Sequence, residues 1–374
     1  MLVYGNALVL LHELGHAAFA RVGGFRVTSF AVGLGPPLLR LSLRGGVVLH
    51  LDRWPVGGSC TAIPLGPTSR RRAWYHAGGL IVQAVLALVL LALPDSWLVN
   101  RIESFNLLVA LTNALPWRLG GSASDGWYLL DAARGGRQQV EILPQRTRLL
   151  RLLTREEAVG SPVGTMYAAL CLAWADVLAG RPDRADPFFE ADPPETALEP
   201  WIDALYTYVR AEWHRQRHRP LAALETVQRG RTAREGELSE AATGLLLLAA
   251  ARARVDLGQH DEAGRALAGI VGDAGPIGRQ ATVVLLWSTL GASPDELEHA
   301  VFRVARRTTE AWLDPADAVA ALTAAADRLG PAGKDAAARG AREAAEQLEH
   351  RLRATASTED RASLAARLQT RYER

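Results

Sequence analysis

Two histidines, His12 and His16, lie four residues apart, and Glu13 stands between them. On a helix this spacing places both imidazoles on one face, where each can give a nitrogen to the same zinc ion. Glu13 lies next to the first ligand and can act as general base on the water that attacks a peptide bond. The pattern therefore predicts a zinc metallopeptidase site.

The residues around this motif are almost all apolar or small. Apart from Asn6, residues 2–20 contain no strongly polar side chain outside the motif itself. A solvated surface helix with two histidines would instead carry a polar face at helical spacing. Ionisable groups inside an apolar span are costly and mark functional sites. We therefore predict a membrane helix at residues 2–22 that carries the motif.

A catalytic zinc ion needs a third protein ligand if one position is to stay open for water. The chain has no Asp or Glu between Glu13 and Asp52, and the residues after His16 do not continue the His-x-x-Gly-x-x-His pattern of some soluble metallopeptidases. The third ligand must therefore come from farther along the chain.

Between residues 25 and 65 the hydrophobic period changes to that of strands, which predicts a hairpin over residues 39–52. A two-residue loop at Gly45-Gly46 would pair Leu41 with His50, whereas a three-residue loop keeps one apolar face. The favoured register pairs Leu43 with Val47, Leu41 with Leu49 and Leu39 with Leu51. His50 is then a polar-face residue, with a role as an extra metal ligand as the less favoured interpretation.

Two further apolar runs predict membrane helices at about residues 77–94 and 104–118, separated by a polar connector at 95–103. Gly78-Gly79 in the first of these helices would permit close approach of another helix. Gln83 is an isolated polar residue there, and it can bind substrate backbone or bond a neighbouring helix. Pro116 should end or kink the second.

These motifs form an ordered set. The His-Glu-x-x-His motif at residues 12–16 is followed by the glycines of the next helix, and then by Asn113-x-x-Pro116 and Asp125-Gly126. This set resembles the site-2 protease family of intramembrane zinc metalloproteases, over residues 1–135. The resemblance implies that His12, His16 and Asp125 bind Zn²⁺ and that Glu13 is the general base.

The chain departs from the family pattern before the aspartate. The second proline of that pattern is missing, and residues 117–124 lengthen the segment. Asp131 is the alternative third ligand. Asn113 and Gln83 are the predicted substrate-binding residues.

Charge indicates orientation rather than a nucleic-acid partner. The formal net charge is only +2, but most N-terminal arginines fall at or between the ends of the first two predicted spans. The positive-inside rule then places residues 23–76 and the chain after residue 118 in the cytoplasm of a bacterial cell, with a multi-pass domain in the plasma membrane. Cys60 and Cys171 are distant in sequence, so we expect no disulfide framework.

The remaining chain is richer in charged residues and predicts a soluble helical domain at 161–374, after a linker at 136–160. Turn-like stretches recur at 180–185, 217–222 and 258–263, with a spacing that resembles tetratricopeptide-like helix pairs. An irregular helical bundle is the alternative. A repeat scaffold would suit binding of a cytoplasmic partner protein.

The predicted fold is thus mainly α, with polytopic membrane helices, a small β-hairpin region and a soluble helical repeat domain. The predicted function is intramembrane cleavage of a membrane protein substrate by a zinc endopeptidase. Because a substrate helix hides its peptide bonds, it must unwind, and the hairpin offers an edge on which it can pair. Two alternatives are an inactive membrane scaffold whose repeats recruit a regulator, and a soluble zinc peptidase.

Overall fold

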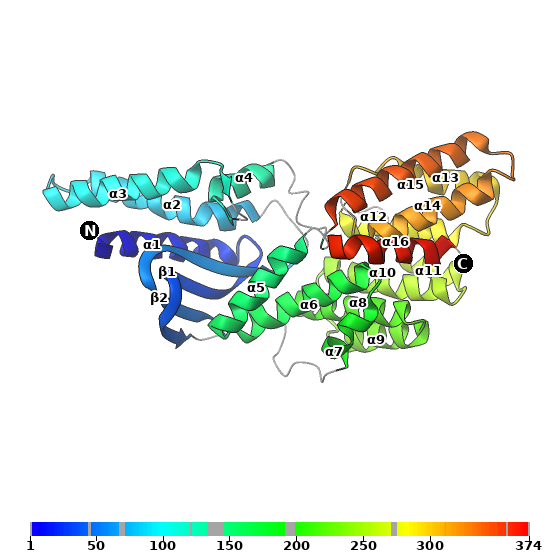
Figure 1. Cartoon of the computed structure of the whole chain (residues 1–374), viewed down its shortest axis with the longest axis horizontal. Helices are drawn as coiled ribbons and strands as arrows, with labels where there is room; N and C mark the ends of the chain where they lie inside the picture. Colours follow the sequence, from blue (N-terminus) through cyan, green and yellow to red (C-terminus); the bar gives the residue numbers. More distant parts are fainter. Residues whose placement is uncertain are drawn as a thin grey trace. The chain divides into compact units, whose positions relative to one another are not determined.

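The computed structural model describes most of the chain, in two compact units (Figure 1). One unit comprises residues 1–137 and 150–168, and the other comprises 138–149 and 169–374. The described residues are 2–43, 46–66, 72–119, 122–133, 142, 145–190, 199–270, 275–310, 312–356 and 358–372.

Three long helices of the first unit match the three predicted spans. They are α1 (Leu2–Ala20), α2 (Arg72–Leu91) and α3 (Trp97–Ala114). The predicted polar connector at 95–103 is wrong beyond residue 96, because α3 begins there. Ser96 caps it, and its Oγ accepts a hydrogen bond of 3.2 Å from the backbone N–H of Val99.

Only α2 is long and apolar enough to cross a bilayer by itself, among the residues that the structure describes. α1 carries the two histidines and Glu13, and α3 carries Arg101 and Glu103, which lower the hydropathy of both helices. The structure therefore supports one candidate membrane span, and the polytopic arrangement stays a prediction.

Glycines set the distance between α1 and α2. A Cβ on Gly15 would overlap the backbone at Gly78, and a Cβ on Gly78 would overlap the backbone at Gly15. The predicted close approach at Gly78-Gly79 is therefore confirmed. Gly79 has a separate role, because a Cβ there would overlap the imidazole of His12.

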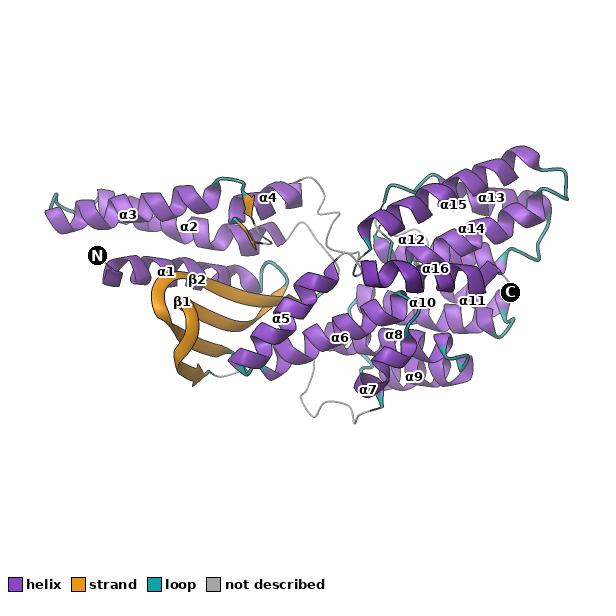
Figure 2. Ribbon diagram, viewed as in Figure 1, coloured by secondary structure: helices purple, strands orange, loops and turns teal. Residues whose placement is uncertain are grey.

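The predicted hairpin is confirmed as β1 (Phe25–Ser42) and β2 (Val48–Pro64) (Figure 2). Leu39 pairs with Leu51 and Leu41 with Leu49, and the N–H of Leu43 donates to the carbonyl of Val47 at 2.7 Å. Both strands are strongly bent, so residues 29–32 of β1 also pair with residues 48–51 of β2. The two strands thus form a small four-segment sheet.

The predicted linker contains the helix α5 (Arg146–Val159), which contacts this sheet. Ser29 Oγ lies 3.2 Å from Glu156 Oε1, and Arg155 hydrogen-bonds Ser59. Residues 150–168 therefore belong to the first unit, and α6 (Pro162–Leu178) crosses into the second.

The second unit is built from helices that pack on their neighbours in sequence: α8 on α9, α10 on α11, α12 on α13 and α14 on α15. Its elements after α6 are η3 (Pro182–Ala185), α7 (Asp186–Phe189), α8 (Pro200–Gln216), α9 (Pro220–Ala233), α10 (Glu240–Asp256), α11 (His260–Leu267), α12 (Pro276–Ser288), α13 (Pro294–Ala305), α14 (Pro315–Leu329), α15 (Asp335–Thr355) and α16 (Thr358–Tyr372).

The three predicted turns are confirmed as helix ends. α6, α8 and α10 are followed by Gly180, His218 and Gly258, each with positive φ. The next residue after each returns a backbone hydrogen bond to the last turn of its helix, as in a Schellman ending. His218 adopts at φ 58° a conformation that elsewhere in this series is taken by glycine.

Candidate metal centre

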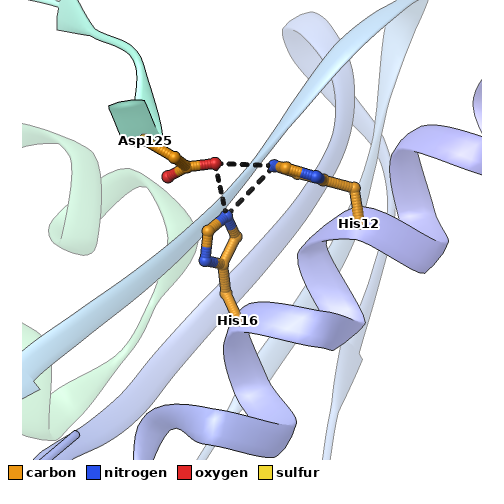
Figure 3. Close-up of side chains that lie close together, drawn as sticks. All are labelled: His12, His16 and Asp125. Carbon is orange, nitrogen blue, oxygen red and sulfur yellow. Dashed lines mark hydrogen bonds and ion pairs between the residues drawn. The ribbon is translucent and has the colours of Figure 1, made fainter. Parts of the chain in front are cut away.

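His12, His16 and Asp125 meet at one point (Figure 3). His12 Nε2 lies 3.0 Å from Asp125 Oδ2, His16 Nε2 lies 3.3 Å from the same oxygen, and the two nitrogens are 3.1 Å apart. Donor atoms on a tetrahedral zinc ion at bond lengths of about 2.0–2.1 Å are about 3.3 Å from one another. The two imidazole nitrogens and the carboxylate oxygen therefore fit a zinc ion, with a fourth position left for water.

The three side chains are nearly buried, with exposed fractions of 4% for His12, 6% for His16 and 9% for Asp125. Burial alone would raise the pKa of the Asp125 carboxyl, but its hydrogen bonds with the two imidazoles outweigh that effect and hold the pKa well below its usual range. The carboxyl group is therefore an anion at neutral pH, as a metal ligand must be.

The longer segment before Asp125 does not displace it, because the additional residues form a small hairpin. Its strands are β3 (Arg118–Leu119) and β4 (Ser122–Ala123). Ser124 joins the two ends of this hairpin. Its Oγ donates to the carbonyl of Leu115 at 2.5 Å and accepts from the N–H of Trp117 at 3.1 Å. The chain thereby returns to the end of α3, next to which α4 (Asp125–Ala133) begins.

Gly126 explains why a glycine follows the aspartate. A Cβ at this position would overlap the carbonyl of Ala114 at the end of α3. Only glycine lets the first turn of α4 approach this closely, and that approach brings Asp125 to the two histidines.

Helix α2 provides a hydrogen-bond acceptor to the Nδ1 atom of each histidine. His12 Nδ1 is 3.1 Å from Gln83 Oε1, and His16 Nδ1 is 2.8 Å from the carbonyl oxygen of Tyr75. Each acceptor fixes a proton on Nδ1 and leaves the Nε2 lone pair for a metal ion. Asn106 packs against the same position of α2, where its Nδ2 donates to the backbone carbonyl oxygen of Gln83 at 2.9 Å.

Glu13 follows the first histidine on α1 and is 7% exposed. The backbone N–H of Cys60 on β2 hydrogen-bonds its carboxylate. Gly58 packs so closely on α1 that a Cβ there would meet side-chain atoms of Val9 and Glu13. β2 therefore runs directly alongside the candidate general base.

The other predicted residues lie as follows. Asn113 Nδ2 donates to the carbonyl of Val109 in its own helix, at 3.0 Å, so its substrate role stays a prediction. Asp131 is not among the grouped metal-binding side chains, and the geometry favours Asp125 instead. His50 pairs with Asp52 at 2.8 Å, away from the group.

Sequence reasoning missed two neighbouring residues on α2, Tyr75 and His76. The Tyr75 contribution is a backbone carbonyl, which no side-chain pattern reveals. His76 left a signal, because it is an ionisable residue directly beside an apolar span.

Comparison with known proteins supports the same assignment for the N-terminal part. Residues 3–109 match Peptidase family M50. A Synechocystis protein named "Putative zinc metalloprotease" is 61% identical over 33 residues, 9% of each chain. Proteins of the same name from Streptococcus pyogenes serotype M1 and Clostridium perfringens are 38% identical over 58 residues and 30% identical over 113 residues.

These matches are confined to a part of each protein. The Streptococcus match covers 16% of this chain and 14% of its relative, and the Clostridium match covers 26% and 33%. The match over residues 3–109 is nevertheless to a family of zinc metallopeptidases, which are peptide-bond hydrolases, and it agrees with the class predicted from the motif. The family match stops before the helical unit, whose tetratricopeptide-like character stays a prediction.

Proposed function

We propose that this protein is a zinc endopeptidase that cleaves a membrane protein substrate within or at the surface of the bilayer. The observation that carries the proposal is the buried group of His12, His16 and Asp125, with Glu13 beside it. Two imidazoles and one carboxylate with room for water are the ligand set of catalytic rather than structural zinc.

The chain's own residues provide the rest of the chemistry. A zinc ion, when bound, would polarise the scissile carbonyl and acidify a water molecule. Glu13 is placed to take the proton of the attacking water and to pass it to the leaving nitrogen. Burial of Glu13 and the three ligands keeps bulk water away, so that their electrostatic interactions are strong.

The sheet supports a mode of substrate binding. Residues 58–64 pair only with residues 25–32 in the described part of the chain, which makes this segment an edge, and it runs past Glu13. An unwound substrate could add to this edge as a further strand and so bring its peptide bond to the site. The predicted edge at residues 39–52 is the alternative position.

The location and partners complete the proposal. α2 and the large exposed apolar side chains of α2 and α3 support a domain embedded in the plasma membrane. The arginines between the first two helices support a cytoplasmic position for the sheet and for the C-terminal unit. The helical unit would bind a cytoplasmic protein partner.

The test is cleavage of tagged single-span model proteins by the detergent-purified full chain. We expect Glu13→Gln to abolish cleavage while bound zinc stays stoichiometric, because the substitution removes the base but no ligand. Glu157→Gln makes the same change on the exposed face of α5 and should leave both properties unchanged.

Cleavage that persists in Glu13→Gln would disprove the assigned base. If the wild type binds zinc but cleaves no model protein, while its helical unit captures a cytoplasmic protein, the inactive scaffold becomes the better interpretation.

A further inference from the structure

We propose that His76 is a positioning residue that hydrogen-bonds Oδ1 of Asp125, so that this carboxylate binds the metal through Oδ2 only. The proposal rests on the proposed zinc site and concerns how that site is built. His76 Nδ1 lies 3.9 Å from Asp125 Oδ1, whereas Asp125 Oδ2 is the oxygen that faces His12 and His16.

α2 provides an outer partner for each of the two histidines. This helix already places one acceptor behind His12, through Gln83, and another behind His16, through the Tyr75 carbonyl. His76 lies two helical turns from Gln83, so these two side chains face the same side of α2, and the preceding residue, Tyr75, contributes its backbone carbonyl. His76 on the same helix would be the corresponding outer partner of the third ligand, Asp125.

Two tyrosines pack against the His76 ring and fix its orientation. Its face stacks on Tyr128, with ring centres 4.4 Å apart and planes 13° apart, and Tyr75 meets it nearly edge-on at 5.0 Å. Tyr128 follows Asp125 by three residues on α4, which puts both on one face of that helix. α4 therefore presents a ring to the face of His76 and a carboxylate to its edge.

His76 and Asp125 are close enough to form a hydrogen bond after a small movement. A separation of 3.9 Å is too long for a hydrogen bond, so the contact must tighten by about 1 Å to form one. Nδ1 of His76 can donate in the charged imidazole and in the neutral tautomer that carries its proton on Nδ1. Outer partners of this kind orient ligands, and their loss weakens metal binding about 10- to 100-fold.

The experiment compares two substitutions of nearly identical shape. Asn at position 76 can present an amide N–H close to where Nδ1 stands, whereas Leu cannot. We expect His76→Leu to weaken Zn²⁺ binding by the detergent-purified full chain about 10- to 100-fold, measured by competition with a chromogenic chelator. His76→Asn should stay within about threefold of the wild type. The visible spectrum of the Co²⁺-loaded chain should change in His76→Leu and not in His76→Asn.

Wild-type zinc affinity and an unchanged Co²⁺ spectrum in His76→Leu would overturn the proposal. So would equal losses in both variants, because the ring's packing and not its N–H would then be responsible. If His76→Leu does not fold, which melting of the metal-free protein reveals, His76→Phe replaces it, since it keeps the stack on Tyr128 without the donor.

These outcomes are distinguishable from failure of the proposed function. A wild type that binds zinc in a His76-dependent manner but cleaves nothing would retain this inference and lose the peptidase. A wild type that cleaves, with His76→Leu metal binding unaltered, would retain the peptidase and lose this inference.

Discussion

The two units of this protein distribute apolar and charged residues in opposite ways. In the first unit the metal-binding side chains are buried while large apolar side chains of α2 and α3 are exposed, with values from 52% to 68% at Val85, Leu88, Val89, Leu91, Leu107, Leu108 and Leu111. In the described part of the second unit, Leu221 and Phe302 are the large apolar side chains that are exposed. The difference supports the proposal that the first unit meets lipid and the second meets water.

The buried charges differ as well. The candidate metal centre brings together one carboxylate and two imidazoles, whose donor atoms all lie within 4.8 Å of one another, and no arginine or lysine pairs with them among the ion pairs of the described residues. In the second unit, Arg252 is 1% exposed and its cation is part of the cluster: it lies 2.7 Å from Asp314, 3.1 Å from Asp317 and 3.1 Å from Glu212. The first cluster therefore has the character of a candidate metal site, and the second has that of a structural network.

The largest expected effect follows from that structural network. Arg252→Met removes the cation that three buried carboxylates share, although Asp314 keeps Arg367 at 2.6 Å and Glu212 keeps Arg215 at 2.7 Å. Removal of one partner from a buried ion pair costs up to about 3–5 kcal/mol. We expect the free energy of unfolding of the helical unit to fall by this amount, measured in denaturant, while zinc binding is unchanged. Arg265→Met, at an exposed pair in α11, should change it by less than about 0.5 kcal/mol.

The converse experiment removes a ligand from the metal centre. Asp125→Ala should weaken Zn²⁺ binding more than about 100-fold, because loss of an outer partner alone costs up to that factor. Stability of the helical unit should not change. Asp131→Ala, one turn and a half farther along α4, is the matched control and should keep its zinc; zinc loss in Asp131→Ala together with retention in Asp125→Ala would reverse the assignment.

The proposed difference in solvent is tested by one substitution made in both units. Leu88 on α2 is 68% exposed and Leu221 on α9 is 65% exposed. If α2 faces lipid, Leu88→Arg should cost about 2–3 kcal/mol of membrane insertion, seen as a smaller fraction that resists alkaline extraction. Leu221→Arg should be neutral within about 0.5 kcal/mol. Equal behaviour of the two variants would mean that both surfaces face water.

The sequence predicts the site better than its surroundings, and the reason is physical. His12, Glu13 and His16 are fixed by helical geometry within one segment, so their spacing alone determines their relation. Asp125 depends on Ser124 and Gly126, which fold the intervening residues back on α3 through contacts that no local pattern shows. α3 begins at Trp97, before the predicted start at residue 104. The Ser96 cap stabilises the first turn of the helix although the residues that follow it are partly polar.

Contacts between residues far apart in the sequence are harder to predict from local patterns. The leucine alternation determined the register of β1 and β2, but their bend into a four-segment sheet requires pairing between residues with no shared pattern, such as Ser29 with Val48. The partners of His12 and His16 on α2 depend on the helix crossing that Gly15 and Gly78 permit.

The smallest expected effect is a pH dependence that belongs to the helical unit. Partial burial lowers the pKa of His214 to about 4, and the nearby Arg210 and Arg219 add to this effect. An unfolded histidine, with a pKa near 6.5, binds a proton in the range between these values that the folded one does not. The unfolded state then binds more protons, so stability falls as the pH drops from about 6.5 toward 4.

This loss should be modest, below about 1 kcal/mol, because His214 is partly accessible to screening solvent. The measurement is best made in the Asp125→Ala background, where zinc release from protonated His12 and His16 cannot contribute to the same pH range. His214→Gln should flatten the decline in unfolding free energy between pH 6.5 and 4. A decline of the same size in His214→Gln would assign the effect to other groups of the helical unit.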